Sequence, residues 1–185
     1  MMPEISLNIL DIVQNSVRAK ASLIQISIIV LTPEDTLTVI IEDNGCGMSR
    51  EQLQRVTDPF FTTRTTRKAG LGVPFFKLAA ESSGGEFDIW SEQEKGTVTK
   101  AVFGLSNIDR MPLGDINGTV YMLITRNTDI DFVYLYKVND RSFVLDTREF
   151  KAILGDVPLD SYEVSGYIKE YLNENKLEAD GGLTI

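Results

Sequence analysis

Apolar residues recur along the chain with two periods, and these periods predict its helices and strands. From Ile5 to Val17 the apolar positions are three and four residues apart, which is typical of one face of an amphipathic helix. Residues 23–31 are rich in β-branched types and residues 38–43 alternate, so both are predicted strands, joined by a turn around Pro33. The two periods together predict helices over about 6–20, 49–57, 73–82, 147–154 and 160–175, and strands over 23–31, 38–43, 86–91, 98–103, 119–125, 131–138 and 142–146.

Turn-forming residues divide the chain into two parts. Residues 104–117 contain clustered glycine, proline, asparagine and aspartate without an apolar period, which predicts a boundary. We therefore expect a larger domain over 1–106 and a small α+β domain over 107–185 that packs on it. No motif assigns a role to 107–185, and both an extension of the sheet and a partner-binding module remain open. Residues 178–185 are expected to form a loose tail.

The predicted strand over 38–43 ends at a carboxylate, Asp43, and a glycine-rich turn follows it. A carboxylate in that place can accept a hydrogen bond from an exocyclic amine such as that of adenine, but it repels the carbonyl oxygen that guanine carries there. Gly45 and Gly47 would let a flat base or ribose approach the backbone. An ordinary turn is the simpler interpretation of this stretch by itself. Further polar and glycine-rich stretches occur elsewhere in the chain, and together with this one they favour a nucleotide site.

The predicted N-terminal helix carries three polar side chains that project from one side. Asp11, Asn15 and Arg18 follow one another at intervals of one turn, which places the β-carbons of such neighbours about 5–6 Å apart. One interpretation is a solvated polar face. The other is that Asp11 orients water or a hydroxyl, Asn15 offers an amide oxygen to Mg²⁺, and Arg18 brings positive charge toward phosphates.

Residues 60–70 have no apolar period and contain four threonines and three cations. An exposed loop would account for this composition. A lid that closes over phosphates accounts for it better, with Phe60 near its root. The glycines of 70–72 then precede a helix, where backbone N–H groups can bind phosphate oxygens.

The composition excludes several classes of function. The chain has no histidine, so Ser-His-Asp and Cys-His catalysis, histidine-ligated zinc and phosphohistidine on this chain are excluded. The single cysteine, Cys46, cannot form an internal disulfide or a thiolate metal cluster, which fits a reducing compartment. A formal charge of −9 disfavours nucleic acid and acidic membranes as partners. With neither a membrane-spanning apolar run nor a secretory leader pattern, we expect a cytoplasmic protein.

In this order and spacing, the motifs of residues 5–103 resemble the ATP-binding domain of the GHKL superfamily, which includes gyrase, heat-shock chaperone, histidine kinase and MutL ATPases. The matching segments are 11–15 (DIVQN) for the N box, 43–47 (DNGCG) for the first glycine box, 59–63 (PFFTT) for the F box, 70–72 (GLG) for the second glycine box and 96–97 (GT) for the last box. The resemblance implies an α/β two-layer sandwich of the Bergerat type, with helices on one face of a mixed, largely antiparallel sheet. It also implies ATP and Mg²⁺ as cofactors.

The resemblance implies a role for each matching residue. Asp11 would be the catalytic residue, Asn15 the Mg²⁺ ligand and Asp43 the adenine-binding residue. The implied cofactor-binding set is Asn15, Arg18, Asp43, Gly45, Gly47, Met48, Phe60, Thr62, Lys68, Gly70, Leu71, Gly72 and Thr97. Two residues depart from the family pattern, since Lys68 stands where kinases often have glycine and Asp11 where the family usually has glutamate. The missing methylene shortens the reach of Asp11 by about 1.5 Å, and a misplacement of about 1 Å can lower a rate about 10²-fold.

Three functions remain open. The segment 59–73 resembles histidine kinases and anti-sigma serine kinases, which favours a Mg²⁺-ATP-binding protein that acts on an unidentified partner protein. Its action would be phosphotransfer in trans, to a separate protein or to serine or threonine, or an ATP-dependent association. Residues 15–19 and 43–47 instead resemble MutL, which implies an ATP-driven clamp with slow hydrolysis, and a homodimer is one such arrangement. The short Asp11 fits a non-catalytic adenine-nucleotide sensor.

Overall fold

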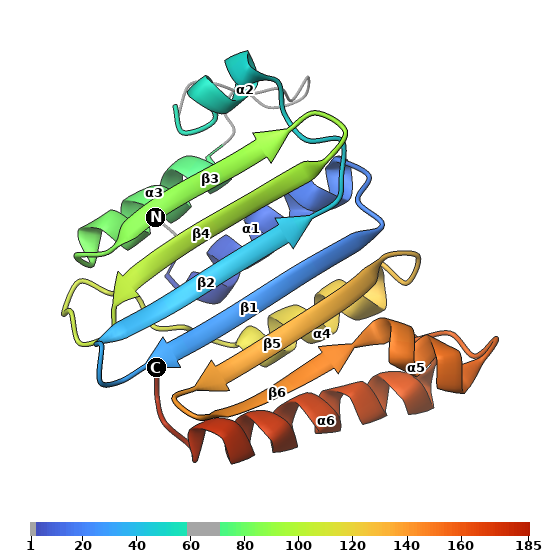
Figure 1. The fold of residues 1–185 in the computed structure, drawn as a ribbon. Coiled ribbons are helices and arrows are strands. Elements are labelled where there is room, and N and C mark those ends of the chain that lie inside the picture. Colours follow the sequence, from blue (N-terminus) through green and yellow to red (C-terminus); the bar gives the residue numbers. More distant parts are fainter. Residues whose placement is uncertain (1–2, 59–70) are drawn as a thin grey trace.

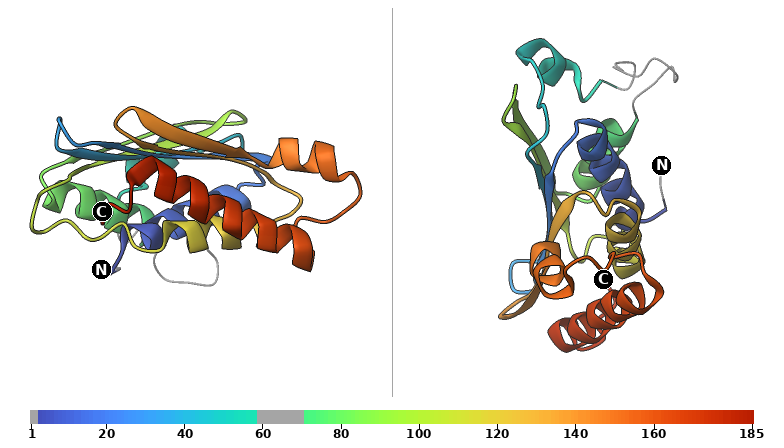
Figure 2. Two further views of the ribbon diagram at one scale, coloured as in Figure 1. Left: turned by 90° about the horizontal axis from the view of Figure 1, so that it is seen from below. Right: turned by 90° about the vertical axis from the view of Figure 1, so that its right-hand side faces the viewer.

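In the computed structural model, which describes residues 3–58 and 71–185, helices cover one face of a six-stranded sheet (Figure 1 and Figure 2). The elements in chain order are α1 (Ile5–Arg18), β1 (Leu23–Leu31), β2 (Thr36–Asp43), α2 (Arg50–Arg55), α3 (Gly72–Ser82), β3 (Glu86–Glu92), β4 (Gly96–Gly104), α4 (Ile116–Arg126), β5 (Asp131–Val138), β6 (Arg141–Asp146), α5 (Thr147–Leu154) and α6 (Tyr162–Asp180). Within the described residues, every helix is too short or too polar to span a lipid bilayer.

The sheet has the strand order β3-β4-β2-β1-β5-β6. Every neighbouring pair is antiparallel except β1 and β5, which run parallel with Leu23 opposite Asp131. The predicted fold class, a two-layer α/β sandwich with a mixed and largely antiparallel sheet, is therefore confirmed. Because β5 pairs with β1, the strands beyond residue 107 lengthen this same sheet, while the division into domains 1–106 and 107–185 stays a prediction.

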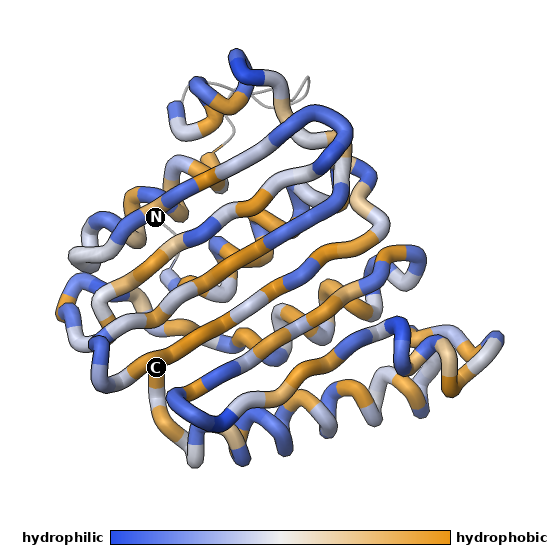
Figure 3. The backbone as a smooth tube through the Cα atoms, in the orientation of Figure 1, coloured by the Kyte–Doolittle hydropathy of each residue, from blue (hydrophilic) through white to orange (hydrophobic). Residues whose placement is uncertain are grey.

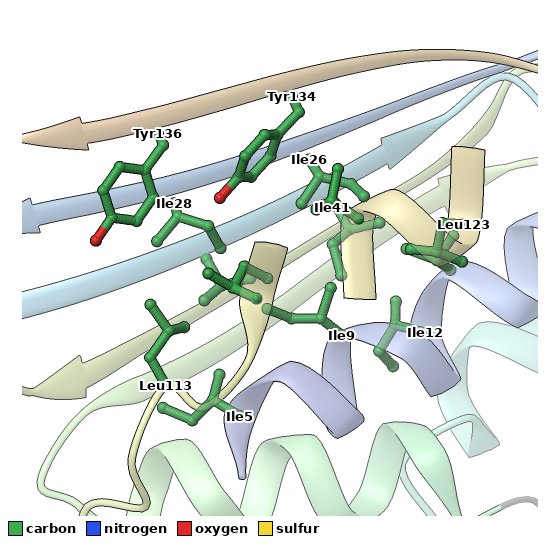
Figure 4. Packing of buried hydrophobic residues seen from close by; sticks show 14 of the residues in the cluster. Ile5, Ile9, Ile12, Ile26, Ile28, Ile41, Leu113, Leu123, Tyr134 and Tyr136 are labelled. Carbon is green, nitrogen blue, oxygen red and sulfur yellow. The ribbon is translucent and has the colours of Figure 1, made fainter. Parts of the chain in front are cut away.

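The core lies between the sheet and the helices. Figure 4 shows Ile9 and Ile12 of α1 beneath Ile26 and Ile41 of the sheet, and all four are buried. Figure 3 shows apolar residues concentrated along the central strands. Burial of one such side chain stabilises the fold by about 1.5–3 kcal/mol. The apolar face predicted for α1 packs on this core, with Val17 only partly buried.

The strand predicted over 119–125 is wrong, because these residues lie in α4. Their β-branched content indicates a strand, but the buried residues Ile116, Val120 and Leu123 are spaced as on a helix face. The carboxylate of Asp115 also caps the helix, since its Oδ1 accepts a hydrogen bond from the N–H of Gly118 at 2.8 Å. One buried face and a cap outweigh the intrinsic β-propensity of the stretch.

We expect Asp115→Ala to lower the free energy of unfolding by about 1 kcal/mol, because the N–H of Gly118 loses its acceptor at the first turn of α4. Urea unfolding followed by circular dichroism measures this change. The control is Asp109→Ala, at an exposed loop position, for which we expect a change within about 0.5 kcal/mol. Equal losses in the two variants would show that the cap contributes nothing.

The C-terminal segment is packed on the protein, so the loose tail predicted over 178–185 is also wrong. Helix α6 continues to Asp180, beyond its predicted end. Ile185 is only 8% exposed, and its carbonyl oxygen accepts a hydrogen bond from the N–H of Leu113 at 2.9 Å. Leu113 in turn belongs to the segment that leads into α4, and its own carbonyl accepts from the N–H of Ser6 at 2.9 Å. The two ends of the chain are thus held by one connecting segment.

A buried carboxylate at the end of α6 is held by three donors. Asp180 Oδ2 accepts from Lys176 Nζ at 2.5 Å and from the hydroxyl of Tyr136 at 3.1 Å, and Oδ1 accepts from the N–H of Gly182 at 2.8 Å. Burial raises the pKa of the Asp180 carboxyl, but the hydrogen bonds, led by that from Lys176, outweigh it and hold the pKa below its ordinary value. The charged form is therefore the one that the fold stabilises.

This lowered pKa predicts a loss of stability in acid. In the unfolded chain an aspartate titrates at about pH 3.9. The contribution of Asp180 to stability is therefore complete above that pH and is lost as the pH falls through its lower pKa in the folded protein. We expect Asp180→Asn to reduce the free energy of unfolding at pH 6 and to reduce it by less at pH 3, as measured by urea unfolding. Asp88→Asn, at an exposed position of β3, is the control that removes the same charge away from these hydrogen bonds. A loss of equal size at both pH values would contradict the assignment.

Candidate functional site

A cavity of about 290 Å³ opens between α1, the turn after β2, α2, the start of α3 and the strands β3 and β4. This volume is at the lower end of the range for ligand pockets, about 300–1,000 Å³. In Figure 1 the turn after β2, the β3–β4 turn and α2 lie at the same end of the sheet. The polar and charged residues that line the cavity are Asn15, Ser16, Arg18, Asp43, Gln52, Thr97 and Thr99.

Asp43 faces this cavity because β2 alternates. Leu37, Val39 and Ile41 point to the helix side of the sheet and are buried, so the next residue in this series points the same way. Asp43 is 8% exposed. Its Oδ2 accepts from the hydroxyl of Ser16 at 2.6 Å, and its Oδ1 accepts from the N–H of Gly45 at 2.9 Å. These two bonds fix the carboxylate and leave each oxygen a further lone pair for a ligand.

Close approach of two turns explains the glycines around Asp43. Gly47 has a φ of +62°, and a Cβ atom there would overlap the carbonyl oxygen of Glu92 in the β3–β4 turn. Gly96 has a φ of +106°, and a Cβ atom there would overlap the carbonyl oxygen of Asp43. Protein backbone thus occupies the space that a side chain at Gly47 or Gly96 would need, while approach of a ligand to Gly45 and Gly47 stays a prediction. Gly47 lines the cavity, and Gly45 packs against Ala19.

The polar face of α1 is divided between the cavity and α3. Asn15 and Arg18 line the cavity, and Arg18 Nη1 donates to Asn15 Oδ1 at 3.1 Å. Asp11 lies instead against Gly72, the first residue of α3. A Cβ atom on Gly72 would lie only 3.0 Å from Asp11 Oδ2. The side chain expected to activate water is therefore adjacent to the cavity and does not line it.

The donor set fits a magnesium ion that is bound mainly through phosphate. The amide oxygen of Asn15, which lines the cavity and accepts a hydrogen bond from Arg18, is an oxygen of the type that Mg²⁺ takes from a protein. Among residues 3–58 and 71–185, no three acidic or cysteine side chains form a metal cluster. Mg²⁺ commonly takes one or two protein oxygens and completes its octahedral shell with phosphate oxygens and water. Asn15 would hold it, and the metal would supply charge to neutralise those phosphates.

The other expected site residues have three kinds of placement. Met48, Gly72 and Thr97 line the cavity. Leu71 stands at the N-cap of α3, outside the cavity lining, and is exposed. The remaining expected residues, which lie outside the described part of the chain, are Phe60, Thr62, Lys68 and Gly70.

Three cavity residues with a hydroxyl or amide side chain were not predicted from the sequence. Ser16 continues the buried stripe of α1, where a polar residue at a core-facing position is the signal for a polar partner. Thr99 is a buried hydroxyl on β4, opposite Ile41 in the strand register. Gln52 belongs to the cap of α2, in which its side chain accepts from the N–H of Ser49 at 2.9 Å and the Ser49 hydroxyl accepts in return from the N–H of Gln52 at 3.2 Å. That capping box stands at the start of the helix predicted over 49–57.

Comparison with known proteins identifies the family. The model of the histidine kinase-, DNA gyrase B-, and HSP90-like ATPase family matches residues 4–107, which is more than half of the chain. The chain therefore belongs to this family of ATP-binding domains.

Individual relatives are named as kinases or as sensor proteins. The chain is 37% identical over 65 residues to sporulation kinase E of Bacillus subtilis, covering 35% of this chain and 9% of that protein. It is 29% identical over 108 residues to the C4-dicarboxylate transport sensor protein DctB of Pseudomonas aeruginosa, covering 57% of this chain and 18% of that protein. Each match thus spans less than a fifth of the relative. What is shared with them lies in the ATP-binding ATPase domain that the family match covers.

A solved structure shares the fold. The N-terminal domain of a DNA repair protein aligns with a TM-score of 0.52 at 14% sequence identity, covering 78% of this chain and 53% of that one. Because the aligned share of this chain is larger than the family match, the likeness extends into the C-terminal strands or helices.

Proposed function

We propose that the protein binds Mg²⁺-ATP in the 290 Å³ cavity and acts on a separate partner protein, by phosphotransfer in trans or by ATP-dependent association. The observation that carries this proposal is the carboxylate of Asp43, buried at the cavity and fixed by Ser16 and the N–H of Gly45. Ser16 and Gly45 both donate to the carboxylate, which carries no hydrogen of its own to donate. Toward a ligand it can therefore act only as a hydrogen-bond acceptor. An exocyclic amine supplies the matching donor.

Adenine fits this requirement and guanine does not. Adenine presents an amine where guanine presents a carbonyl oxygen, which the Asp43 carboxylate would repel. A buried group left unpaired by the wrong ligand discriminates strongly, by about 10⁴-fold or more in favourable cases. The hydroxyls of Thr97 and Thr99 line the same cavity and can donate to acceptor nitrogens of the base.

The phosphates would extend from the base toward Asn15 and Arg18. Arg18 brings a positive charge to the cavity, and Asn15 brings the amide oxygen for Mg²⁺. Asp11 would be the catalytic residue, although its position against Gly72 supports slow rather than rapid hydrolysis, because a general base needs hydrogen-bond reach to the proton it removes. Slow hydrolysis leaves ATP available for transfer of its phosphoryl group to a partner, or for an association that requires bound ATP.

Nucleotide selectivity tests the binding step. In titration calorimetry with Mg²⁺ present, we expect ATP to bind and GTP to bind at least about 10²-fold more weakly, because guanine cannot satisfy Asp43. Absence of ATP binding, or equal affinities for the two nucleotides, would overturn the proposal.

The fate of the γ-phosphate tests the action on a partner. The protein is incubated with γ-labelled ATP and Mg²⁺, alone and with each candidate partner protein. Label on the partner, or a partner that associates only when ATP is present, would support the proposal. Free phosphate together with an ATP-driven increase in the mass of this protein alone would indicate a clamp. ATP that stays bound and unaltered without any associated partner would indicate a nucleotide sensor.

A further inference from the structure

Helix α5 leaves much of its apolar side uncovered. Phe150, Ile153 and Leu154 lie on one side of the helix, and Val157 continues their spacing. Phe150 and Leu154 are partly buried against the core, so the uncovered part of this side is Ile153 together with Val157. Ile153 is 85% exposed and Val157 is 49% exposed. On α1, in contrast, the apolar residues Ile5, Ile9, Ile12 and Val13 are all buried. A helix whose apolar residues all lie on one side ordinarily buries that side against another element.

The uncovered apolar residues continue onto α6. The ring of Phe150 lies 6.0 Å from that of Tyr167 and 5.8 Å from that of Tyr171, measured between centroids. Tyr167 is 57% exposed. Figure 1 places α5 after the outermost strand β6, beside the start of α6, and Figure 3 shows apolar colour at the end of α5. We call the residues Phe150, Ile153, Leu154, Val157 and Tyr167 the α5 surface.

The surroundings of the α5 surface are acidic. From 152 to 170 the sequence contains four acids, Asp156, Asp160, Glu163 and Glu170, and one cation, Lys169, and all five are exposed. The nearest cations on α5 are engaged elsewhere, since Arg148 pairs with Asp146 at 2.6 Å and Lys151 with Asp131 at 2.7 Å. A second copy of the chain would bring like charges together, and an anionic membrane would be repelled.

We propose that the α5 surface binds a basic amphipathic helix of a partner protein. Apolar side chains of that helix would pack on Ile153, Val157 and Tyr167, and its lysines or arginines would face the acidic residues around them. An amphipathic helix laid into an apolar surface is a common recognition mode, in which a few central contacts supply most of the affinity. The α5 surface lies outside residues 4–107, so this interaction goes beyond nucleotide binding and does not depend on it.

A designed peptide provides the probe. It is an 18-residue helix with leucine on one face and lysine on the other, carrying a fluorophore, and a second peptide has glutamate in place of every lysine. Fluorescence anisotropy measures the binding of each to the full chain without nucleotide. Two variants of the chain, Ile153→Glu and Ile108→Glu, separate the apolar contact from charge. Each adds one negative charge at a highly exposed isoleucine, and Ile108 is 96% exposed in a loop before α4.

We expect the lysine peptide to bind the unchanged chain and Ile108→Glu equally, and to bind Ile153→Glu about tenfold more weakly, because an apolar contact at the centre of the surface is lost. Simple charge attraction would instead strengthen binding to Ile153→Glu. The glutamate peptide should not bind. Equal binding of the lysine peptide to the two variants would overturn the proposal, as would an absence of binding. Self-association of the chain in sedimentation that Ile153→Glu abolishes, or binding to vesicles of anionic lipid that Ile153→Glu abolishes, would overturn it in favour of another occupant.

Discussion

The Asp43→Asn variant should lose ATP affinity by at least about 100-fold while remaining folded. In the native site Ser16 and the N–H of Gly45 both donate to the carboxylate. An asparagine can keep the bond from Gly45 through its oxygen, and its amide group can donate to the Ser16 oxygen. The second hydrogen of that amide then points toward the ligand, where it meets the amine of adenine donor to donor. A buried mismatch of this kind costs about 1–3 kcal/mol or more.

Titration calorimetry with Mg²⁺-ATP measures the loss, and urea unfolding shows whether the fold is retained. Asp88→Asn provides the control, because it removes the same charge from an exposed position of β3. Its ATP affinity should equal that of the unchanged protein. Should Asp43→Asn bind ATP as tightly as the unchanged protein, Asp43 would not be the group that recognises the base.

The Gly96→Ala variant should lose about 3 kcal/mol or more of the free energy of unfolding. At a φ of +106° an alanine is strained, and its methyl group would overlap the carbonyl oxygen of Asp43. The neighbour is backbone, so relief requires β2 and the β3–β4 turn to separate. Because that carbonyl belongs to the residue at the centre of the cavity, ATP affinity should fall as well.

Gly166→Ala is the matched comparison for urea unfolding. Gly166 lies within α6, and a Cβ atom there would meet nothing within 4 Å. Alanine should therefore stabilise the protein, by up to about 1 kcal/mol, through its better helix propensity. If Gly96→Ala were as stable as the unchanged protein, the two turns would not be as closely packed as the structure shows.

Local patterns, together with the order of the motifs, were sufficient for the fold class and for part of the cavity lining. The alternation of β2 predicts that Asp43 ends a buried strand, and the helical spacing of α1 predicts that Asn15 and Arg18 share a side. Motif order then predicts the nucleotide-binding family, which the family match confirms. In each case the informative residues are close together in the chain or belong to one motif set.

Features that depend on distant pairing were not predictable in this way. The parallel pairing of β1 with β5 joins segments about a hundred residues apart, and no period encodes it. The bond from Ser16 to Asp43 and the contact of Asp11 with Gly72 likewise arise only when α1 packs between β2 and α3. In α4 the β-branched residues indicated a strand, although the spacing of Ile116, Val120 and Leu123 is typical of a helix.

The parallel pairing of β1 with β5 has a consequence for any shortened form of the protein. A chain that ended where the family match ends would lack β5, and β1 would then become an unpaired edge strand of the sheet. This strand has nine residues and is rich in isoleucine and valine. Its unpaired N–H and C=O groups would offer a template for other chains, a recognised route to aggregation. Apart from any binding role, the C-terminal segment thus covers this edge of the sheet and protects the ATPase domain from aggregation through β1.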